Sequence, residues 1–191
     1  MRPKRDWNKY IHKNRTCGDC QLVTAVNAYY YLTGKTVEEK EYMEFAEECG
    51  CTHGACISVE KAWKKLGIKI KKTYRTHDLP DGKFVEKDGF TTYKLMKLPL
   101  PIEISVWHRK CGLHSVLIVD QDLNTDCFRI TNFPWETNDG WMFRNELYKF
   151  LRPVEEFLRD YDIPEEVKEN LPKEYPFRRE KYVYRLFGLE K

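Results

Sequence analysis

Apolar residues change their spacing at Gly67, from the period of helices to that of strands. Before this point they recur about every three to four positions, as on one face of a helix. After it come short runs that are rich in β-branched and aromatic residues and bounded by turn formers: IKIKKTY, PIEISVW, HSVLIVD and CFRITNF. Helices that come first and strands that come second are typical of an α+β fold rather than of repeated βαβ units. We therefore predict an α+β protein.

The segment Asp19–Leu32 is apolar on nearly every side, which is typical of a helix buried in the core. Gly34 follows it as a helix stop. Thr36 and Glu39 have the spacing of a capping box, which predicts the start of a second, amphipathic helix. Ser58 predicts the N-cap of a third helix.

Length and composition suit one domain over residues 1–191. Of the 191 residues, 41% are hydrophobic and 14% are aromatic, which is enough to build a core. We expect a helical part over about 13–80 and a β part over about 81–143. A charged, helical C-terminal extension is expected over about 144–191, with YVYRLF as a last strand.

The charge is nearly balanced, with 33 Lys and Arg against 30 Asp and Glu and a net charge of +3. Binding to nucleic acid needs basic residues clustered on one face, so we expect no nucleic-acid partner. No run approaches the roughly 18 apolar residues of a membrane span, and no apolar stretch follows the charged N-terminus as in a secretory signal. We therefore expect a cytoplasmic protein, in which disulfides are rare outside thermophilic sources.

Two of the seven cysteines, Cys17 and Cys20, stand three positions apart at the start of the apolar helix. By residue type alone they could be metal ligands, halves of disulfides, buried packing residues or a nucleophile. Cys20 lies in the first helical turn, where the helix dipole favours an anion and lowers the pKa of a thiol. This position favours a nucleophile at Cys20.

A histidine opens one strand of a predicted hairpin, and an asparagine follows the next strand. Pairing apolar residues across the hairpin puts Ile118 opposite Phe128. The same register puts His114 opposite Asn132, with Cβ atoms about 5 Å apart, so that the amide oxygen can accept a hydrogen bond from the imidazole. The alternative is a histidine and an asparagine satisfied by turn backbone at a strand edge. With the thiol of Cys20, the pair predicts a Cys–His–Asn triad.

The segments CGDC, GLHSV and TNFPW, in this order, resemble the motifs of the papain-like cysteine peptidases. The resemblance implies a papain-like fold, in which a helical subdomain holds the nucleophile helix against an antiparallel β-sheet subdomain. It implies Cys20 as nucleophile, His114 as general base and acid, and Asn132 as the group that orients the imidazole. The implied activity is hydrolysis of peptide or isopeptide bonds in a peptide or protein substrate, through a thioester and with neither metal nor cofactor.

A fourth segment, GCTHGACISVEKAWKKLGI, resembles the G-C-x-G-G segment of the family and the helix after it. By resemblance, Cys17 is disulfide-bonded to Cys51. Gly54 then lies where the backbone pairs with an extended substrate. Trp135 shields the bond between histidine and asparagine from water.

Two positions depart from the papain pattern. Asn14 stands six residues before the nucleophile, where the family has the glutamine that donates to the oxyanion, and it is the expected donor here. Gln21 replaces the tryptophan after the nucleophile. Asp19 precedes Cys20, and an Asp-Cys pair six residues after an amide side chain is closer to the bacteriocin-leader peptidases of the same superfamily.

Other functions fit parts of the pattern. A structural zinc site could use several of the cysteines, and Cys49 with Cys56 could form a second disulfide or be buried thiols. A thiol-dependent acyltransferase would use the same nucleophile and base. A catalytically inactive relative would serve as a binding or structural protein, and the substitutions at Asn14 and Gln21 are consistent with that role.

Overall fold

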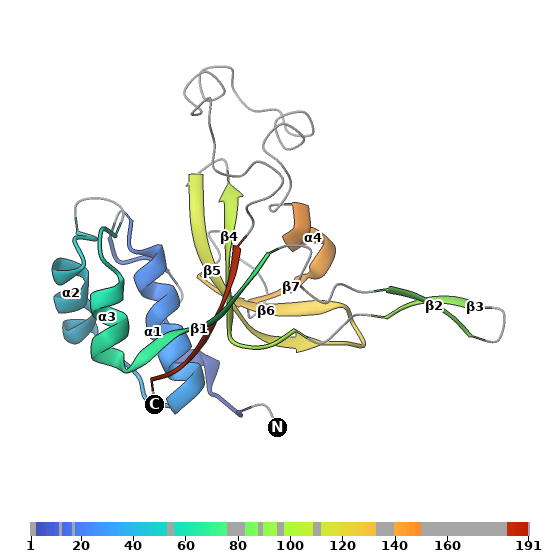
Figure 1. Ribbon diagram of the computed structural model, residues 1–191, viewed down its shortest axis with the longest axis horizontal. Helices are drawn as coiled ribbons and strands as arrows, with labels where there is room; N and C mark the ends of the chain where they lie inside the picture. Colours follow the sequence, from blue (N-terminus) through green and yellow to red (C-terminus); the bar gives the residue numbers. More distant parts are fainter. Residues whose placement is uncertain are drawn as a thin grey trace, which may run out of the picture.

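Helices α1, α2 and α3 gather on one side of an antiparallel sheet, and the short helix α4 lies apart from them beside β7 (Figure 1), so the predicted α+β class is confirmed. The computed structural model describes residues 3–11, 13–16, 18–52, 56–75, 83–87, 90–94, 98–108, 112–132, 140–149 and 183–190. The helices are η1 (Trp7–Lys9), α1 (Cys20–Thr33), α2 (Glu39–Glu48), α3 (Glu60–Leu66) and α4 (Arg144–Lys149). The strands are β1 (Ile68–Arg75), β2 (Lys83–Lys87), β3 (Phe90–Lys94), β4 (Ile102–His108), β5 (Gly112–Asp122), β6 (Cys127–Thr131), β7 (Trp141–Phe143) and β8 (Val183–Leu189).

α1 is the buried helix that the apolar segment predicts. It begins at Cys20, and Gly34 ends it in the left-handed conformation with a φ of 78°. The helix lies against β5 on one side and against α3 on the other, while α2 packs on α3 (Figure 1). Outward from the sheet come α1, then α3, then α2. Because α1 lies between the sheet and α3, it is apolar on nearly every side.

The other two helices of this layer begin later than predicted. The N-cap of α2 is Glu38, and no side chain caps that end, so the capping box of Thr36 and Glu39 is wrong. The N-cap of α3 is Val59 instead of Ser58, whose carbonyl instead accepts a hydrogen bond in the first turn. Packing of the apolar faces therefore sets these two helix starts more strongly than the local capping signal does.

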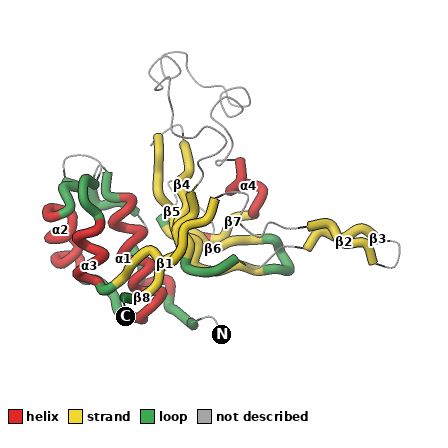
Figure 2. Tube along the Cα trace, in the orientation of Figure 1, coloured by secondary structure: helices red, strands yellow, loops and turns green. Residues whose placement is uncertain are grey.

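The six-stranded sheet has the order β1-β8-β4-β5-β6-β7, with every neighbouring pair antiparallel. β8 lies between β1 and β4, so the end of the chain pairs with a strand that directly follows the helices. The last strand that YVYRLF predicts is therefore confirmed as β8, and the expected helical extension begins with α4, while residues 150–182 lie outside the described residues. β2 and β3 form a separate two-stranded hairpin that projects away from the helices (Figure 2).

The register between β5 and β6 differs from the predicted one. Ile118 pairs with Ile130, two residues further along β6 than the predicted Phe128. A four-residue turn sets this register, because Asp122 at its start accepts hydrogen bonds from within the turn. A bulge at Val119 then shifts the pairing by one residue.

β5 is buried on both faces. Leu117 and Val119 belong to the core that the helices share with β1 and β8. Val116 and Ile118 are buried on the other face. Since side chains alternate along a strand, His114 lies on the face of Val116, and Ser115 lies on the face of Leu117 next to α1.

Candidate active site

Cys20 is the first residue of α1 and lies against the start of β5. The backbone N–H groups of Ser115 and Gln21 donate to its thiol. Thr24, one turn into the helix, joins the two elements: its hydroxyl lies 2.8 Å from the carbonyl oxygen of Cys20 and 3.2 Å from the hydroxyl of Ser115. The packing of α1 on β5 therefore places the thiol beside the residue that follows His114.

The environment of Cys20 disfavours a thiolate. Burial raises the pKa of this thiol above its ordinary value of 9.0, and the carboxylates of Glu103 and Asp19 raise it further. The N–H groups of Ser115 and Gln21 lower the pKa by less. The expectation that the helix start lowers the pKa is therefore wrong, because loss of water and two nearby carboxylates outweigh the helix dipole.

The His114 imidazole is buried and held by backbone. Its Nε2 lies 2.5 Å from the carbonyl oxygen of Asn132. Burial lowers the pKa of this imidazole, whereas the Asn132 carbonyl and the Asp19 carboxylate raise it by less. A carbonyl oxygen only accepts, so Nε2 carries the proton in the neutral ring, and the lone pair of Nδ1 is left to act as a base.

Asn132 reaches His114 through its backbone and not through its side chain. Its φ of 59° ends β6 in the left-handed region and turns the carbonyl toward the imidazole. The side-chain Nδ2 donates instead to Oδ1 of Asn14 at 2.9 Å and to the carbonyl oxygen of Ser115 at 3.4 Å. The predicted bond between the imidazole and the Asn132 amide oxygen is therefore wrong, although the two residues do meet.

The loop before the nucleophile is held by Asp19, which is fully buried. Its Oδ2 accepts hydrogen bonds from the N–H of Arg15 at 2.8 Å, the N–H of Thr16 at 3.1 Å and the hydroxyl of Tyr42 at 2.5 Å. These bonds fix the segment that carries Asn14. Asp19 is the N-cap residue of α1, but its side chain binds the preceding loop and makes no cap hydrogen bond to the helix, a role that its place in the sequence does not predict.

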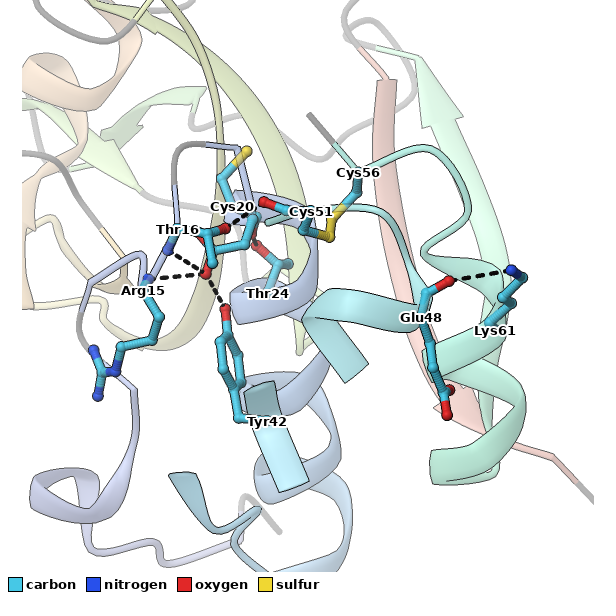
Figure 3. Close-up of a disulfide and its surroundings, with 10 residues drawn as sticks. Arg15, Thr16, Cys20, Thr24, Tyr42, Glu48, Cys51, Cys56 and Lys61 are labelled. Atoms are coloured by element: carbon cyan, nitrogen blue, oxygen red, sulfur yellow. Dashed lines mark hydrogen bonds between the residues drawn. A yellow bond between two sulfur atoms is a disulfide. The ribbon is translucent and has the colours of Figure 1, made fainter. Parts of the chain in front are cut away.

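A disulfide braces the same loop from the other side. Cys51 is bonded to Cys56, so the expected pairing of Cys51 with Cys17 is wrong, since one sulfur makes one disulfide. The carbonyl of Cys51 accepts a hydrogen bond from the Thr16 hydroxyl at 2.6 Å, and the N–H of Cys56 donates to the carbonyl of Gly18 at 3.2 Å (Figure 3). The Cys51–Cys56 segment is thereby tied to the loop that precedes Cys20.

Three residues with predicted roles lie where the structure describes nothing, and the other described cysteines are either oxidised or free thiols. Cys17, Gly54 and Trp135 lie outside the described residues. With Cys51 and Cys56 oxidised, a zinc site loses two of its candidate thiolates. Cys49 is a buried free thiol and Cys127 a half-buried one.

Four of the predicted site residues meet at one place. Asn14, His114 and Asn132 are joined by hydrogen bonds, and Cys20 reaches them through the backbone of Ser115. Within the residues that the structure describes, no hydrogen bond joins the thiol to the imidazole. The arrangement therefore supplies a nucleophile and an oriented base that have to approach each other for proton transfer.

Beneath the site, a buried polar network crosses the sheet. Glu103 on β4 accepts hydrogen bonds from the Ser115 hydroxyl and from Arg185 on β8, the latter at 2.7 Å. Burial raises the pKa of the Glu103 carboxyl, against the lowering effect of Arg185 and Ser115. The network continues through Ser115 to Thr24 on α1, so it connects the last strand to the helix that presents the thiol.

In the residues described, no helix is long and apolar enough to cross a membrane. Comparison of the chain with models of protein families, with curated proteins and with solved structures finds no match.

Proposed function

We propose that this protein is a papain-like thiol hydrolase that cleaves peptide or isopeptide bonds with Cys20 and His114. The observation that carries the proposal is the position of the thiol. Cys20 begins a buried helix and is held by the N–H of Ser115, directly after a histidine whose Nε2 is engaged by a carbonyl. A thiol next to the strand that carries a histidine, whose Nδ1 makes no hydrogen bond among the described residues, supplies the nucleophile and the base that acyl transfer requires.

Both groups are uncharged at rest, so the proton moves during attack. On substrate binding the thiol leaves the N–H of Ser115 and approaches Nδ1 of His114, since catalytic hydrogen bonds often form only in the complex. Nδ1 takes the thiol proton as sulfur bonds to the carbonyl carbon. The oxyanion is held by the N–H of Cys20 and by Nδ2 of Asn14.

The second half of the reaction returns the enzyme to its starting state. The His114 imidazolium gives its proton to the leaving nitrogen, the C–N bond breaks, and a thioester to Cys20 remains. His114 then takes a proton from water, whose oxygen attacks the thioester carbon. The acid product leaves as the proton returns to sulfur.

The test uses an electrophile that mimics a peptide acyl group. We expect a peptidyl acyloxymethyl ketone at pH 8 to form an adduct that peptide mapping locates at Cys20. The adduct should be absent in Cys20→Ser and should form more than about 100-fold more slowly in His114→Ala, because the base that takes the thiol proton is lost. Cys127→Ser, which removes another free thiol, is the matched control and should label as the unmodified protein does.

Equal labelling of Cys20 and Cys127, or an unchanged rate in His114→Ala, would refute the hydrolase proposal. A second candidate is a catalytically inactive relative with a binding role. The raised thiol pKa and the bond of the thiol to Ser115 instead of His114 favour it. Under that proposal the protein stays unlabelled at Cys20 across pH 6–9.

A further inference from the structure

We infer that Asn132 is a positioning residue, whose side chain holds the amide of Asn14 in the orientation that leaves the Asn14 nitrogen for the oxyanion. The backbone carbonyl of the same residue orients the His114 imidazole. The inference rests on the proposed function, because Asn14 acts there as the oxyanion donor. It differs from a triad in which the asparagine side chain serves the histidine.

The Asn132 side chain makes two hydrogen bonds, and the bond to the Ser115 carbonyl fixes which of its atoms is the donor. The carbonyl oxygen of Ser115 can only accept, so the Asn132 atom 3.4 Å from it is Nδ2 and not Oδ1. The same Nδ2 lies 2.9 Å from the side chain of Asn14. A donor there requires an acceptor on Asn14, so Oδ1 of Asn14 faces Asn132. Among the described residues, none accepts a hydrogen bond from the Asn14 Nδ2.

Burial gives this orientation its strength. Only 3% of Asn132 is exposed, and Asn14 is half-buried. Turning the Asn132 amide over would place its oxygen against the carbonyl of Ser115 and leave this carbonyl without its side-chain donor, which costs about 1–3 kcal/mol for an unsatisfied buried group. The amide of Asn132 is thereby fixed, and it fixes that of Asn14.

The two tasks of Asn132 are carried by separate atoms, which makes them separable by substitution. A φ of 59° is needed to turn its carbonyl toward His114. Glycine adopts positive φ without strain, so Asn132→Gly keeps the backbone carbonyl and removes only the side chain. Asn132→Asp also tolerates this conformation, but it replaces the donor with a second acceptor.

The experiment compares turnover with simple alkylation. Hydrolysis of a peptidyl ester forms an oxyanion, whereas alkylation of Cys20 by iodoacetamide does not. In Asn132→Gly we expect kcat to fall about 10- to 100-fold, because an unheld Asn14 no longer presents its donor. KM and the pH profile of alkylation should be unchanged, because His114 keeps its bond to the backbone.

Two further variants test whether Asn132 acts through Asn14. In Asn132→Asp the carboxylate draws the Asn14 nitrogen toward itself, so kcat should fall as far as in Asn14→Ala. The double variant Asn14→Ala with Asn132→Gly should be no slower than Asn14→Ala alone, because residues that act as one unit are not additive.

The outcomes separate this inference from the proposed function. Wild-type kcat in Asn132→Gly, or additive losses in the double variant, would overturn the positioning role and leave the hydrolase standing. A wild-type protein without Cys20-dependent ester hydrolysis would overturn the hydrolase. If the Asn132 variants do not fold, NMR of the wild-type protein decides: a coupling across the hydrogen bond from Nδ2 of Asn132 to Cγ of Asn14 is expected, and its absence contradicts the inference.

Discussion

One oxygen of Asp19 carries three hydrogen bonds, and these hold the loop before the nucleophile. Burial, and then the bond to Asp19, raises the pKa of the Tyr42 hydroxyl well above its ordinary value of 10.0. Tyr42 therefore stays protonated and remains a donor at neutral pH. The backbone N–H groups of Arg15 and Thr16 have this carboxylate as their acceptor.

At the residue scale, we expect Tyr42→Phe to lower the free energy of unfolding by about 1 kcal/mol, as for one lost hydrogen bond. Asp19→Ala should cost more than twice as much, because it leaves three donors without their acceptor. Urea unfolding measures both variants. Equal losses would mean that the N–H groups of Arg15 and Thr16 find other acceptors.

A second expectation at this scale concerns the titration of Cys20. Because its pKa is raised from 9.0, the thiolate is scarce at pH 7, and its fraction grows about tenfold for each pH unit below the pKa. The rate of alkylation of Cys20 by iodoacetamide, followed by peptide mapping, should therefore climb with pH through 9. A rate that levels off below pH 7 would contradict the structure. Cys20→Ser identifies the background at this peptide.

The residue types at the site follow from the sequence, but their hydrogen-bond partners do not. Cys20, His114, Asn132 and Asn14 are all brought together as the motifs suggest. That His114 uses a backbone carbonyl depends on the φ of Asn132, which no pattern of residue types encodes. The raised pKa of Cys20 comes first from burial and then from the Glu103 carboxylate, and both depend on the packing of the helix on the sheet.

At the scale of elements, the sequence predicts the glycine stop of α1, but neither the starts of α2 and α3 nor the register of β5 and β6. Gly34 ends α1 as predicted, and Gly67 ends α3 in the same left-handed conformation, because a left-handed stop depends on the glycine itself. The register of β5 and β6 differs from the predicted one by two residues, because pairing Ile118 with Ile130 keeps apolar residues together as well as pairing it with Phe128 would, so the four-residue turn decides between them. The short strand β7 was not predicted either.

The disulfide loop gives a test at this scale. Closing the small loop between Cys51 and Cys56 should stabilise the fold by about 2 kcal/mol in the chain-entropy model. We therefore expect a reductant, or the variant Cys56→Ser, to lower the free energy of unfolding by about 2 kcal/mol and so to lower the urea concentration at the unfolding midpoint. Cys127→Ser, which removes a free thiol, should have little effect. Non-reducing peptide mapping should give a Cys51–Cys56 peptide, and a peptide that joins Cys17 to Cys51 would contradict the structure.

At the scale of the whole molecule, the ion pair between Glu103 and Arg185 fastens β8 to β4. Glu103 is 2% exposed and Arg185 26%. We expect Arg185→Gln to lower the free energy of unfolding by about 3 kcal/mol at pH 7, because it strands a buried carboxylate. Arg15→Gln, which breaks an exposed pair with Glu39, is the matched control and should cost less than about 1 kcal/mol.

The loss in Arg185→Gln should depend on pH. The folded Glu103 has a pKa above its unfolded value of 4.5, and removing Arg185 raises it further. The folded state then holds the proton more tightly than the unfolded chain, so the free energy of unfolding falls as pH rises from 4.5 toward the folded pKa. Urea unfolding should show the largest loss at pH 7 and a smaller one near pH 5. An equal loss at both values would contradict a charged, buried Glu103.

The place of β8 between β1 and β4 also dictates when the sheet can form during synthesis. β1 and β4 are made early, but each has to wait for residues 183–189 before it gains this shared neighbour. Until then both strands leave the ribosome with open hydrogen-bonding edges, which are sites of wrong pairing between nascent chains. The loop before Cys20 and helix α1 can form early. The hydrogen bond from Arg185 to Glu103 beneath them forms only after β8 has been synthesised.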